Sequence, residues 1–427
     1  MLTIFGERQR FCDGLSRRDF LKIGAMGFGG LTLSQVLRSA AQADETGKRH
    51  KSVIMVYLPG GASHMDTYDL KPNAPLEYRG EFKAISSTVP GMDFCEHFPR
   101  QAAIAEKLTI VRSVVGAVSE HAPALLMSGY GDAVGKAQGG RPGVGAILSK
   151  LLGAVDPRVP PYASLMGNAA GLDSGYAGVA HRPFTPDGPG MQNLSLDGSI
   201  SLNRLDDRRA LLAGFDRFRN EADRSGVMTG MDSFTARAFE MIVSPKTRDA
   251  LDLNREDPRT RERYGKATQF LTARRLVEAG VRCVTLAIGG WDTHNNNFGH
   301  LRDQLPHVDQ SIAALVEDLH VRGLDEDCSV VVWGEFGRTP RVNGNAGRDH
   351  WEPVMSALMA GGGLKMGQVI GSTNARGETA IDRPITVQQV LATLYHGLGV
   401  DPASTLTTPS GRPMYLLDDR IPIAEMI

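Results

Sequence analysis

Four apolar, β-branched runs in this chain each lead into a short polar loop. These runs have the composition of buried strands: Val53–Leu58, Leu108–Val111, Val281–Ile288 and Ser329–Trp333. The loops that follow them carry Asp, Glu, His or Ser. In open α/β sheets, ligands bind just beyond the carboxyl ends of the strands. We therefore expect these loops to meet in one crevice that carries the chemistry of the protein.

Strand patterns alternate with helical patterns along most of the chain, which favours a mostly parallel sheet covered by helices. A further short strand is expected at Tyr162–Met166, and a strand or buried turn near Val354–Met359. Helices are expected near Phe98–Glu106, Ala122–Met127, Gly143–Leu152, Arg259–Ala279, Leu301–Arg322 and Val387–Leu398. The stretch of about 167–255 is rich in Gly, Pro and charge and has no apolar strand run, so it is predicted as a loop and helical insertion.

The N-terminus has the three parts of an export signal in order. Paired arginines, Arg17 and Arg18, precede an apolar, Gly-rich stretch that runs to about Leu37, and an A-x-A-like site ends at Ala43. This order predicts a cleavable signal over residues 1–43, and the paired arginines indicate the twin-arginine route. The alternative is a basic amphipathic helix of the mature protein.

Residues 44–427 are predicted to form one domain that is periplasmic or secreted, with the twin-arginine export machinery as a partner. The net charge of −1 gives no electrostatic case for a nucleic acid partner. No second run of about twenty apolar residues predicts a stable membrane span. After the signal, which holds Cys12, the odd number of cysteines argues against a disulfide framework. We expect Cys283 and Cys328 to be buried small apolar residues of strands.

Two Asp-His pairs have metal-ligand chemistry. Asp292 and His294 follow the third strand run, and Asp349 and His350 lie in a Gly- and Asn-rich loop further on. Carboxylate oxygen and imidazole nitrogen both suit zinc or manganese. The alternative for the first pair is that Asp292 caps the following helix and His294 is merely exposed.

The other strand-end loops add further ligand types. His64 and Asp66 follow the first strand run, and Glu335 follows the fourth. With the two Asp-His pairs, they provide enough ligands for one or two divalent ions, zinc being favoured and manganese or calcium being alternatives. The competing interpretation is that the polar loops are unrelated.

Nucleophile and anion-binding chemistry is also present. Ser119 and His121 precede a helical run, and a helix N-terminus with a nearby cation can lower the pKa of a serine or hold an anion. The alternative is that Ser119 only caps the helix. Three arginines crowd the loop after the fourth run: Arg338, Arg341 and Arg348. One of them could clamp phosphate or sulfate bidentately, although each taken singly is typical of a surface arginine.

Five segments taken in order resemble the secreted family catalogued as domain of unknown function 1501: GGASHMDTYD, SEHAPALLMSGY, GGWDTH, WGEFGRTP and GRDHW. More broadly, these motifs resemble the alkaline phosphatase–sulfatase superfamily. The resemblance implies an alkaline-phosphatase-like three-layer α/β sandwich with a mostly parallel central sheet. It also implies that Ser119 is the nucleophile and that the metal ligands are His64, Asp66, Asp292, His294 (or His300), Glu335 and His350.

The chain departs from the superfamily pattern in three places. Phe336 stands where a His ligand is usual, so a second metal loses a ligand unless His64 replaces it. Glu335 stands in place of an Asp. Ser119 is not in a Cys-x-Pro-x-Arg context, so the formylglycine modification of type I sulfatases is not expected.

The leading hypothesis is therefore an exported, metal-dependent hydrolase of phosphate or sulfate esters. Its substrate would be a small-molecule or polysaccharide ester, with catalytic roles for Ser119, His121 and Arg338. The alternative is a catalytically degenerate member of the superfamily that acts as a cell-surface or carbohydrate-binding scaffold.

Overall fold

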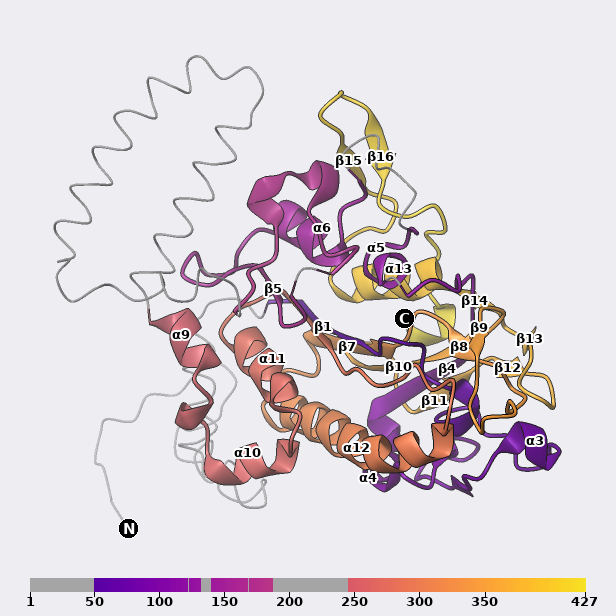
Figure 1. Ribbon diagram of the computed structural model, residues 1–427. Helices are drawn as coiled ribbons and strands as arrows, with labels where there is room; N and C mark the ends of the chain where they lie inside the picture. The colour runs from indigo at the N-terminus through magenta and orange to yellow at the C-terminus, as the bar shows by residue number, and fades with distance from the viewer. Residues whose placement is uncertain (1–49, 122, 132–139, 168, 187–244) are drawn as a thin grey trace, which may run out of the picture. The chain divides into compact units, whose positions relative to one another are not determined.

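The fold is organised around one large sheet (Figure 1). The computed structural model describes residues 50–121, 123–131, 140–167, 169–186 and 245–427, so the predicted export signal and most of the predicted insertion lie outside the described residues. The strands of the sheet are β1 (Ser52–Tyr57), β4 (Leu108–Val115), β5 (Tyr162–Ser164), β6 (Cys283–Ala287), β7 (Cys328–Trp333), β10 (Met355–Gly361), β11 (Gln368–Ile370) and β14 (Ile385–Thr386). Their order is β11-β4-β10-β7-β1-β6-β5, and β14 pairs with β4.

One strand of this sheet, β10, runs antiparallel to its neighbours β4 and β7, whereas the other pairings are parallel. The first residues of β10 therefore lie at the edge where β1, β4, β6 and β7 end. The loop that carries Asp349 and His350 precedes β10 and reaches this same edge. Five polar loops thus meet where the sequence pattern predicts a crevice.

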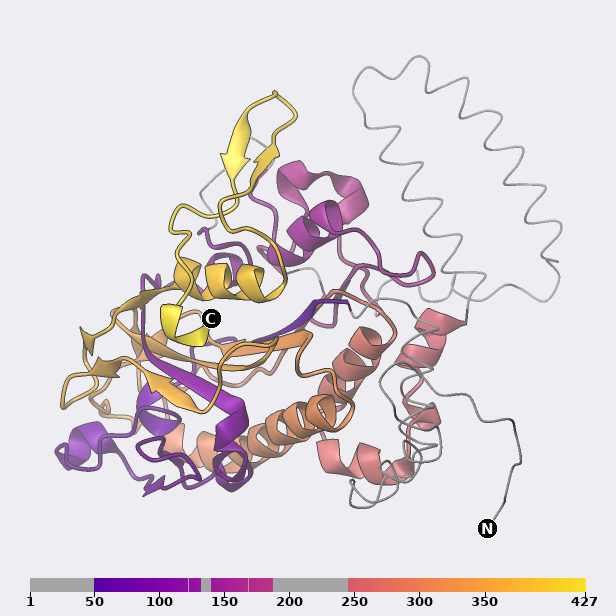
Figure 2. The ribbon, with the colours of Figure 1, turned by 180° about the vertical axis from the view of Figure 1, so that it is seen from behind.

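Alternate residues of β1 pack into two different cores, as the two-residue period of a strand requires. Ile54 and Val56 belong to a core that includes residues of α4 (Pro99–Ala103), α11 (Thr268–Glu278) and α12 (Asn297–Val321). Val53 and Met55 belong to a core that includes residues of α5 (Ala124–Ser128), α6 (Val144–Leu151) and α13 (Val387–Gly397). Figures 1 and 2 show these helices on opposite faces of the sheet. The predicted three-layer α/β class with a mostly parallel sheet is confirmed.

The prediction of a single helix over Arg259–Ala279 is wrong. The segment forms two helices, α10 (Pro258–Tyr264) and α11, which Gly265 separates. Its φ of +62° is accessible to glycine, and a Cβ at this position would lie 2.6 Å from the side-chain oxygen of Gln310. The first helix therefore ends at this residue.

Short elements complete the described structure. The remaining helix and strand bounds are α3 (Leu76–Arg79), β2 (Ala84–Ile85), β3 (Phe94–Cys95), α9 (Lys246–Leu251), β8 (Gly337–Arg338), β9 (His350–Trp351), β12 (Ser372–Thr373), β13 (Ala380–Asp382), β15 (Thr405–Thr407) and β16 (Pro413–Tyr415). Single 3-10 turns lie at His64–Asp66, Ala105–Lys107, Gly175–Ala177, Val179–His181, Leu253–Arg255 and Ala424–Met426. Of these pieces, the antiparallel ribbon of β8 and β9 matters most, because it borders the site.

Two other expectations can be compared with the described residues. Cys283 and Cys328 are buried, which confirms the expectation for these two residues, and Cys95 is buried as well. Among the described helices, none combines the length and the apolar character needed to span a bilayer.

Candidate metal centre

The carboxylate of Asp292 is surrounded by three imidazoles and a guanidinium. Its Oδ1 lies 3.0 Å from Nε2 of His294 and 3.4 Å from Nε2 of His350, and its Oδ2 lies 3.5 Å from Nε2 of His121. Arg338 donates from Nη2 to Oδ1 at 2.5 Å. These side chains come from the loops that follow β4, β6 and β7 and from the segment before β10. The topology of the sheet therefore assembles the group, which we call the Asp292 cluster.

Three atoms of the Asp292 cluster have the spacing of metal ligands. Oδ1 of Asp292 and the Nε2 atoms of His294 and His350 form a triangle with edges of 3.0, 3.4 and 3.2 Å. Metal–ligand bonds of about 2.0–2.1 Å in tetrahedral geometry place neighbouring ligand atoms about 3.3 Å apart. His121 offers a further donor, since ligand atoms of His121, Asp292 and His350 all lie within 4.8 Å of one another. The residues present fit one divalent ion.

The electrostatics of the cluster favour the protonation states that bind a cation. Burial raises the pKa of Asp292, but the hydrogen bond and charge of Arg338, with His294 and His121, outweigh it and leave this pKa lowered. Burial, and next the charges of Arg338 and His121, lower the pKa of His350. An ionised carboxylate and a neutral imidazole are the ligand forms of these groups.

Asp349, predicted as a ligand, lies behind His294. Its Oδ1 is 2.6 Å from Nδ1 of His294, and Nδ2 of Asn343 donates to both of its oxygens at 3.3 Å. The hydrogen bond from His294 lowers the pKa of Asp349. A carboxylate on the second ring nitrogen of a ligating histidine fixes the tautomer and orientation of the ring. The placement of Asp349 suits this supporting role.

Glu335, also predicted as a ligand, is buried and held by backbone amides. Its Oε1 accepts from the N–H of Gly60 at 2.8 Å and its Oε2 accepts from that of Gly61 at 3.1 Å. The same Oε1 lies 3.0 Å from Nδ1 of His121. Burial, and next the Glu335 charge, raise the pKa of Tyr57, so that this phenol stays protonated. Through its contact with Nδ1, Glu335 orients the His121 ring toward Asp292.

The structure does not bring His64 and Asp66 into the Asp292 cluster. Asp66 is fully buried and receives Nε of Arg348 at 2.7 Å, Nη2 of Arg348 at 3.0 Å and Nδ2 of Asn297 at 3.0 Å. His64 is also fully buried, and its Nε2 lies 2.8 Å from the carbonyl oxygen of Gly377. Because Asp66 and Glu335 are occupied by protein donors, the residues predicted for a second metal do not fit a second ion.

Phe336, at the position of a usual superfamily ligand, packs against the imidazoles of His350 and His121. Its ring is fully buried, with its centroid 4.3 Å from that of His350 and 5.3 Å from that of His121. Gly61 makes room for it, since a Cβ there would lie 2.4 Å from the Phe336 ring. Phe336 thus supplies no ligand but gives His350 and His121 an apolar support.

The three arginines of this region differ in environment. Arg338 and Arg348 are fully buried, whereas Arg341 is exposed, so the surface interpretation is wrong for the first two. Besides its bond to Asp292, Arg338 donates to the carbonyl oxygens of Gly61 at 3.2 Å and Arg348 at 2.9 Å. These acceptors fix its guanidinium against the carboxylate.

Ser119 and Asp292 do not cap the helices that follow them, so neither of these two alternatives holds. Ser119 is exposed, and Pro123 precedes α5. The Ser119 side chain instead lowers the pKa of Glu352. Asn296, not Asp292, stands before α12, and His300 is an exposed residue of that helix.

Sequence reasoning missed part of the supporting structure. Asn343 and the amides of Gly60 and Gly61 were not singled out, although they hold Asp349 and Glu335. The glycine pair directly after the first strand was the one available signal. Nothing in the sequence pointed to Asn343.

The sequence matches the family described as "Protein of unknown function (DUF1501)" over residues 50–427. Since the match spans most of the chain, the chain belongs to this family. No curated protein sequence matches it.

Solved structures share a distant likeness with the chain. The PsFucS1 sulfatase from Pseudoalteromonas sp. is 13% identical, with 86% of this chain and 70% of that chain covered and a TM-score of 0.38. The phosphonate monoester hydrolase SpPMH from Silicibacter pomeroyi is 11% identical, with 83% and 74% covered and a TM-score of 0.33. The lipoteichoic acid synthase LtaP from Listeria monocytogenes is 10% identical, with 90% and 81% covered and a TM-score of 0.35.

Proposed function

We propose that this member of the family is an exported, metal-dependent hydrolase of sulfate or phosphate esters. The observation that carries the proposal is the Asp292 cluster, in which His121, His294, His350 and Arg338 converge on one carboxylate at the edge where the strands end. This is the position at which open α/β sheets bind ligands. The motif resemblance to the alkaline phosphatase–sulfatase superfamily supports the reaction class.

Zinc suits the donor set best. Asp292 with His294 and His350 offers one oxygen and two nitrogens, and calcium prefers oxygen ligands alone. Manganese accepts the same donors with lower affinity. A divalent ion held by these residues would act as a Lewis acid on the ester and lower the pKa of a coordinated water.

The other residues of the cluster have roles of their own. His121 is the candidate acid–base group, because its Nδ1 is held by the buried carboxylate of Glu335 and its side chain is 44% exposed and open to substrate. Arg338 keeps Asp292 ionised and in place through its hydrogen bond. These residues hold and move protons beside the site where an ester would lie.

Ser119 is the candidate nucleophile. It lies two residues before His121 in an exposed loop, and its side chain lowers the pKa of Glu352. A carboxylate with a lowered pKa stays ionised and can orient a hydroxyl at neutral pH. Ser119→Ala would abolish turnover if the serine attacks the ester, and would leave turnover largely intact if water attacks.

The test is turnover of aryl sulfates and aryl phosphates by zinc-loaded protein. Wild type is compared with Asp292→Ala, and with Asp303→Ala as an exposed aspartate of α12 outside the cluster. We expect turnover by wild type and Asp303→Ala and at least a 100-fold loss in Asp292→Ala. Equal background rates in all three proteins would contradict the proposal.

Phe336 favours a second candidate function. Because it removes a usual ligand of the superfamily, the chain could be a catalytically degenerate scaffold at the cell surface that binds carbohydrate or a partner. The same screen separates the two functions. A scaffold without activity should give only background turnover, whichever variant is tested and whichever metal is added.

Export by the twin-arginine route is part of the proposal. Its support is the order of Arg17, Arg18, the apolar stretch and the Ala43 site. Replacing Arg17 and Arg18 together by lysine should hold the chain in the cytoplasm, whereas Arg8→Lys should not. Cell fractionation with an antibody to the C-terminus measures this, and normal export of the double variant would contradict it.

A further inference from the structure

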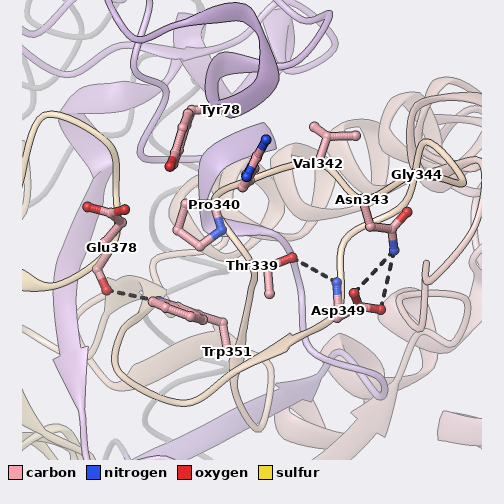
Figure 3. A pocket seen from close by; sticks show the side chains of 10 residues that line it. Tyr78, Thr339, Pro340, Val342, Asn343, Gly344, Asp349, Trp351 and Glu378 are labelled. Carbon is pink, nitrogen blue, oxygen red and sulfur yellow. Dashed lines mark hydrogen bonds between the residues drawn. The ribbon is translucent and has the colours of Figure 1, made fainter.

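A pocket of about 550 Å³ lies beside the Asp292 cluster (Figure 3). Residues from the loop between β8 and β9 line it, together with Tyr78 and Glu378 from distant parts of the chain. Its volume lies within the range of small-molecule sites. Neither the motifs nor the proposed hydrolysis accounts for it.

The β8–β9 ribbon separates this pocket from the metal ligands. Arg338 and His350 are paired across the ribbon, and both contact Asp292. The residues directly next to them along the chain, Thr339, Asp349 and Trp351, line the pocket. Because neighbouring residues of a strand point to opposite faces, one ribbon serves both sites. Asp349 connects them, since its Oδ1 also lies 2.6 Å from Nδ1 of His294.

The lining combines fixed aromatic rings with polar groups. Nε1 of Trp351 donates to the backbone oxygen of Glu378 at 2.8 Å, which sets the plane of the indole. The amide of Asn343 is held on Asp349, as Figure 3 shows. Tyr78 adds a second ring on the far wall. The rings offer apolar faces, the carboxylates offer hydrogen-bond acceptors, and Arg341 offers donors.

We propose that this pocket binds an uncharged sugar ring of an oligosaccharide. The C–H face of a pyranose packs on an aromatic ring, and its hydroxyls can donate to Asp349 and accept from Arg341.

The charges of the lining disfavour other ligands. Two carboxylates, Asp349 and Glu378, line the pocket with one guanidinium, Arg341, so a sulfate or phosphate group would lie close to two like charges. A cation is disfavoured because the Arg376 guanidinium already lies 5.1 Å from the centroid of the Tyr78 ring. A neutral polyol suits this mixture of groups better than either ion.

Tryptophan fluorescence offers a direct measurement of binding. Trp291 and Trp333 are buried, with 2% and 0% of their surface exposed, whereas Trp351 is partly exposed in the pocket. The wild-type protein is titrated with hexasaccharides of β-1,4-glucose, β-1,4-xylose and agarose, and separately with inorganic sulfate and tetramethylammonium. We expect a saturable change in emission with at least one hexasaccharide and no change with the two ions.

Calorimetric titration with the hexasaccharide that binds then locates the site. Trp351→Ala and Tyr78→Ala should each weaken binding at least 10-fold, with a circular dichroism spectrum like that of wild type. Tyr415→Ala, which removes an exposed aromatic outside the pocket, should leave binding unchanged. Asp292→Ala should still bind, so a failure of the proposed hydrolysis leaves this inference intact.

Three results would overturn the inference. These are no saturable binding of any hexasaccharide, binding of sulfate or tetramethylammonium in place of the sugars, and equal affinity in wild type and Trp351→Ala.

Discussion

Asp66 and Arg348 form a fully buried ion pair that ties the segment after β1 to the loop carrying His350. Nε of Arg348 lies 2.7 Å from Oδ2 of Asp66, and Nη2 lies 3.0 Å from Oδ1. The Oγ of Ser63 also donates to Oδ2, at 2.6 Å. Since Arg348 precedes the Asp349-His350 pair, Asp66 positions a candidate metal ligand and is not free to be one.

Asp66→Ala should strongly destabilise the protein. Removal of one partner of a buried ion pair leaves an uncompensated charge and costs about 3–5 kcal/mol. Glu81→Ala is the matched control, because Glu81 pairs with Arg302 where both side chains are 51% exposed, and exposed pairs contribute about 0–1 kcal/mol. Urea unfolding of the metal-free proteins measures both changes. A loss below 1 kcal/mol in Asp66→Ala would show that the pair does not anchor the loop.

Asp349→Ala should weaken metal binding without unfolding the site. The carboxylate fixes the ring of His294, and loss of such a partner typically lowers metal affinity about 10–100-fold. Competition with a chromophoric zinc chelator measures the affinity. Asp303→Ala serves again as the exposed control on α12. Unchanged zinc affinity in Asp349→Ala would place Asp349 outside the support of the metal centre.

Phe336→Ala should lower both stability and zinc affinity. Truncation of a fully buried phenylalanine costs about 3–5 kcal/mol, and here it also removes the ring that backs His350. Phe270→Ala, which truncates a buried residue of α11, is expected to cost as much stability but to leave zinc affinity unchanged. If the two variants bind zinc equally well, Phe336 has no role beyond packing.

The metal-free protein should lose stability as the pH falls below about 6.5, and His350 should account for part of the loss. The folded-state pKa of His350 is lowered by burial, Arg338 and His121, whereas the unfolded chain has the ordinary value of about 6.5. In this range the unfolded chain binds more protons than the folded one, so the free energy of unfolding falls as the pH falls. The side chain is 24% exposed, and solvent screening keeps the effect small.

Urea unfolding at pH 7.5 and 5.5 tests this prediction in wild type and His350→Gln. The decrease in the free energy of unfolding should be larger in wild type. An equal decrease in the two proteins would mean that His350 has the same pKa in the folded and unfolded chains.

The sequence predicted those features of the fold that depend on the local pattern of apolar and polar residues. The runs that became β1, β6 and β7 are β-branched and buried, and a parallel sheet brings their ends together, so the meeting of Asp292, His294 and Glu335 near one edge followed. The break at Gly265 was missed because a helical pattern continues on both sides of it. The β8–β9 ribbon was missed because two residues per strand carry no periodicity.

The roles of the buried charges depend on long-range partners that no local pattern reveals. Arg348 is 282 residues from Asp66, and Glu335 is 275 residues from the amide of Gly60. The motif resemblance marked Asp66 and Glu335 as ligands by position. The structure surrounds both carboxylates with protein donors, which changes the expected number of ions from one or two to one.

The metal content of the purified protein tests this account most directly. After loading with zinc and desalting, inductively coupled plasma mass spectrometry should find one zinc per wild-type chain and less than one tenth per chain in Asp292→Ala. Asp66→Asn, if it remains folded by circular dichroism, should retain more zinc than Asp292→Ala. No zinc in wild type, two ions per chain, or equal content in wild type and Asp292→Ala would contradict a single metal centre built on Asp292.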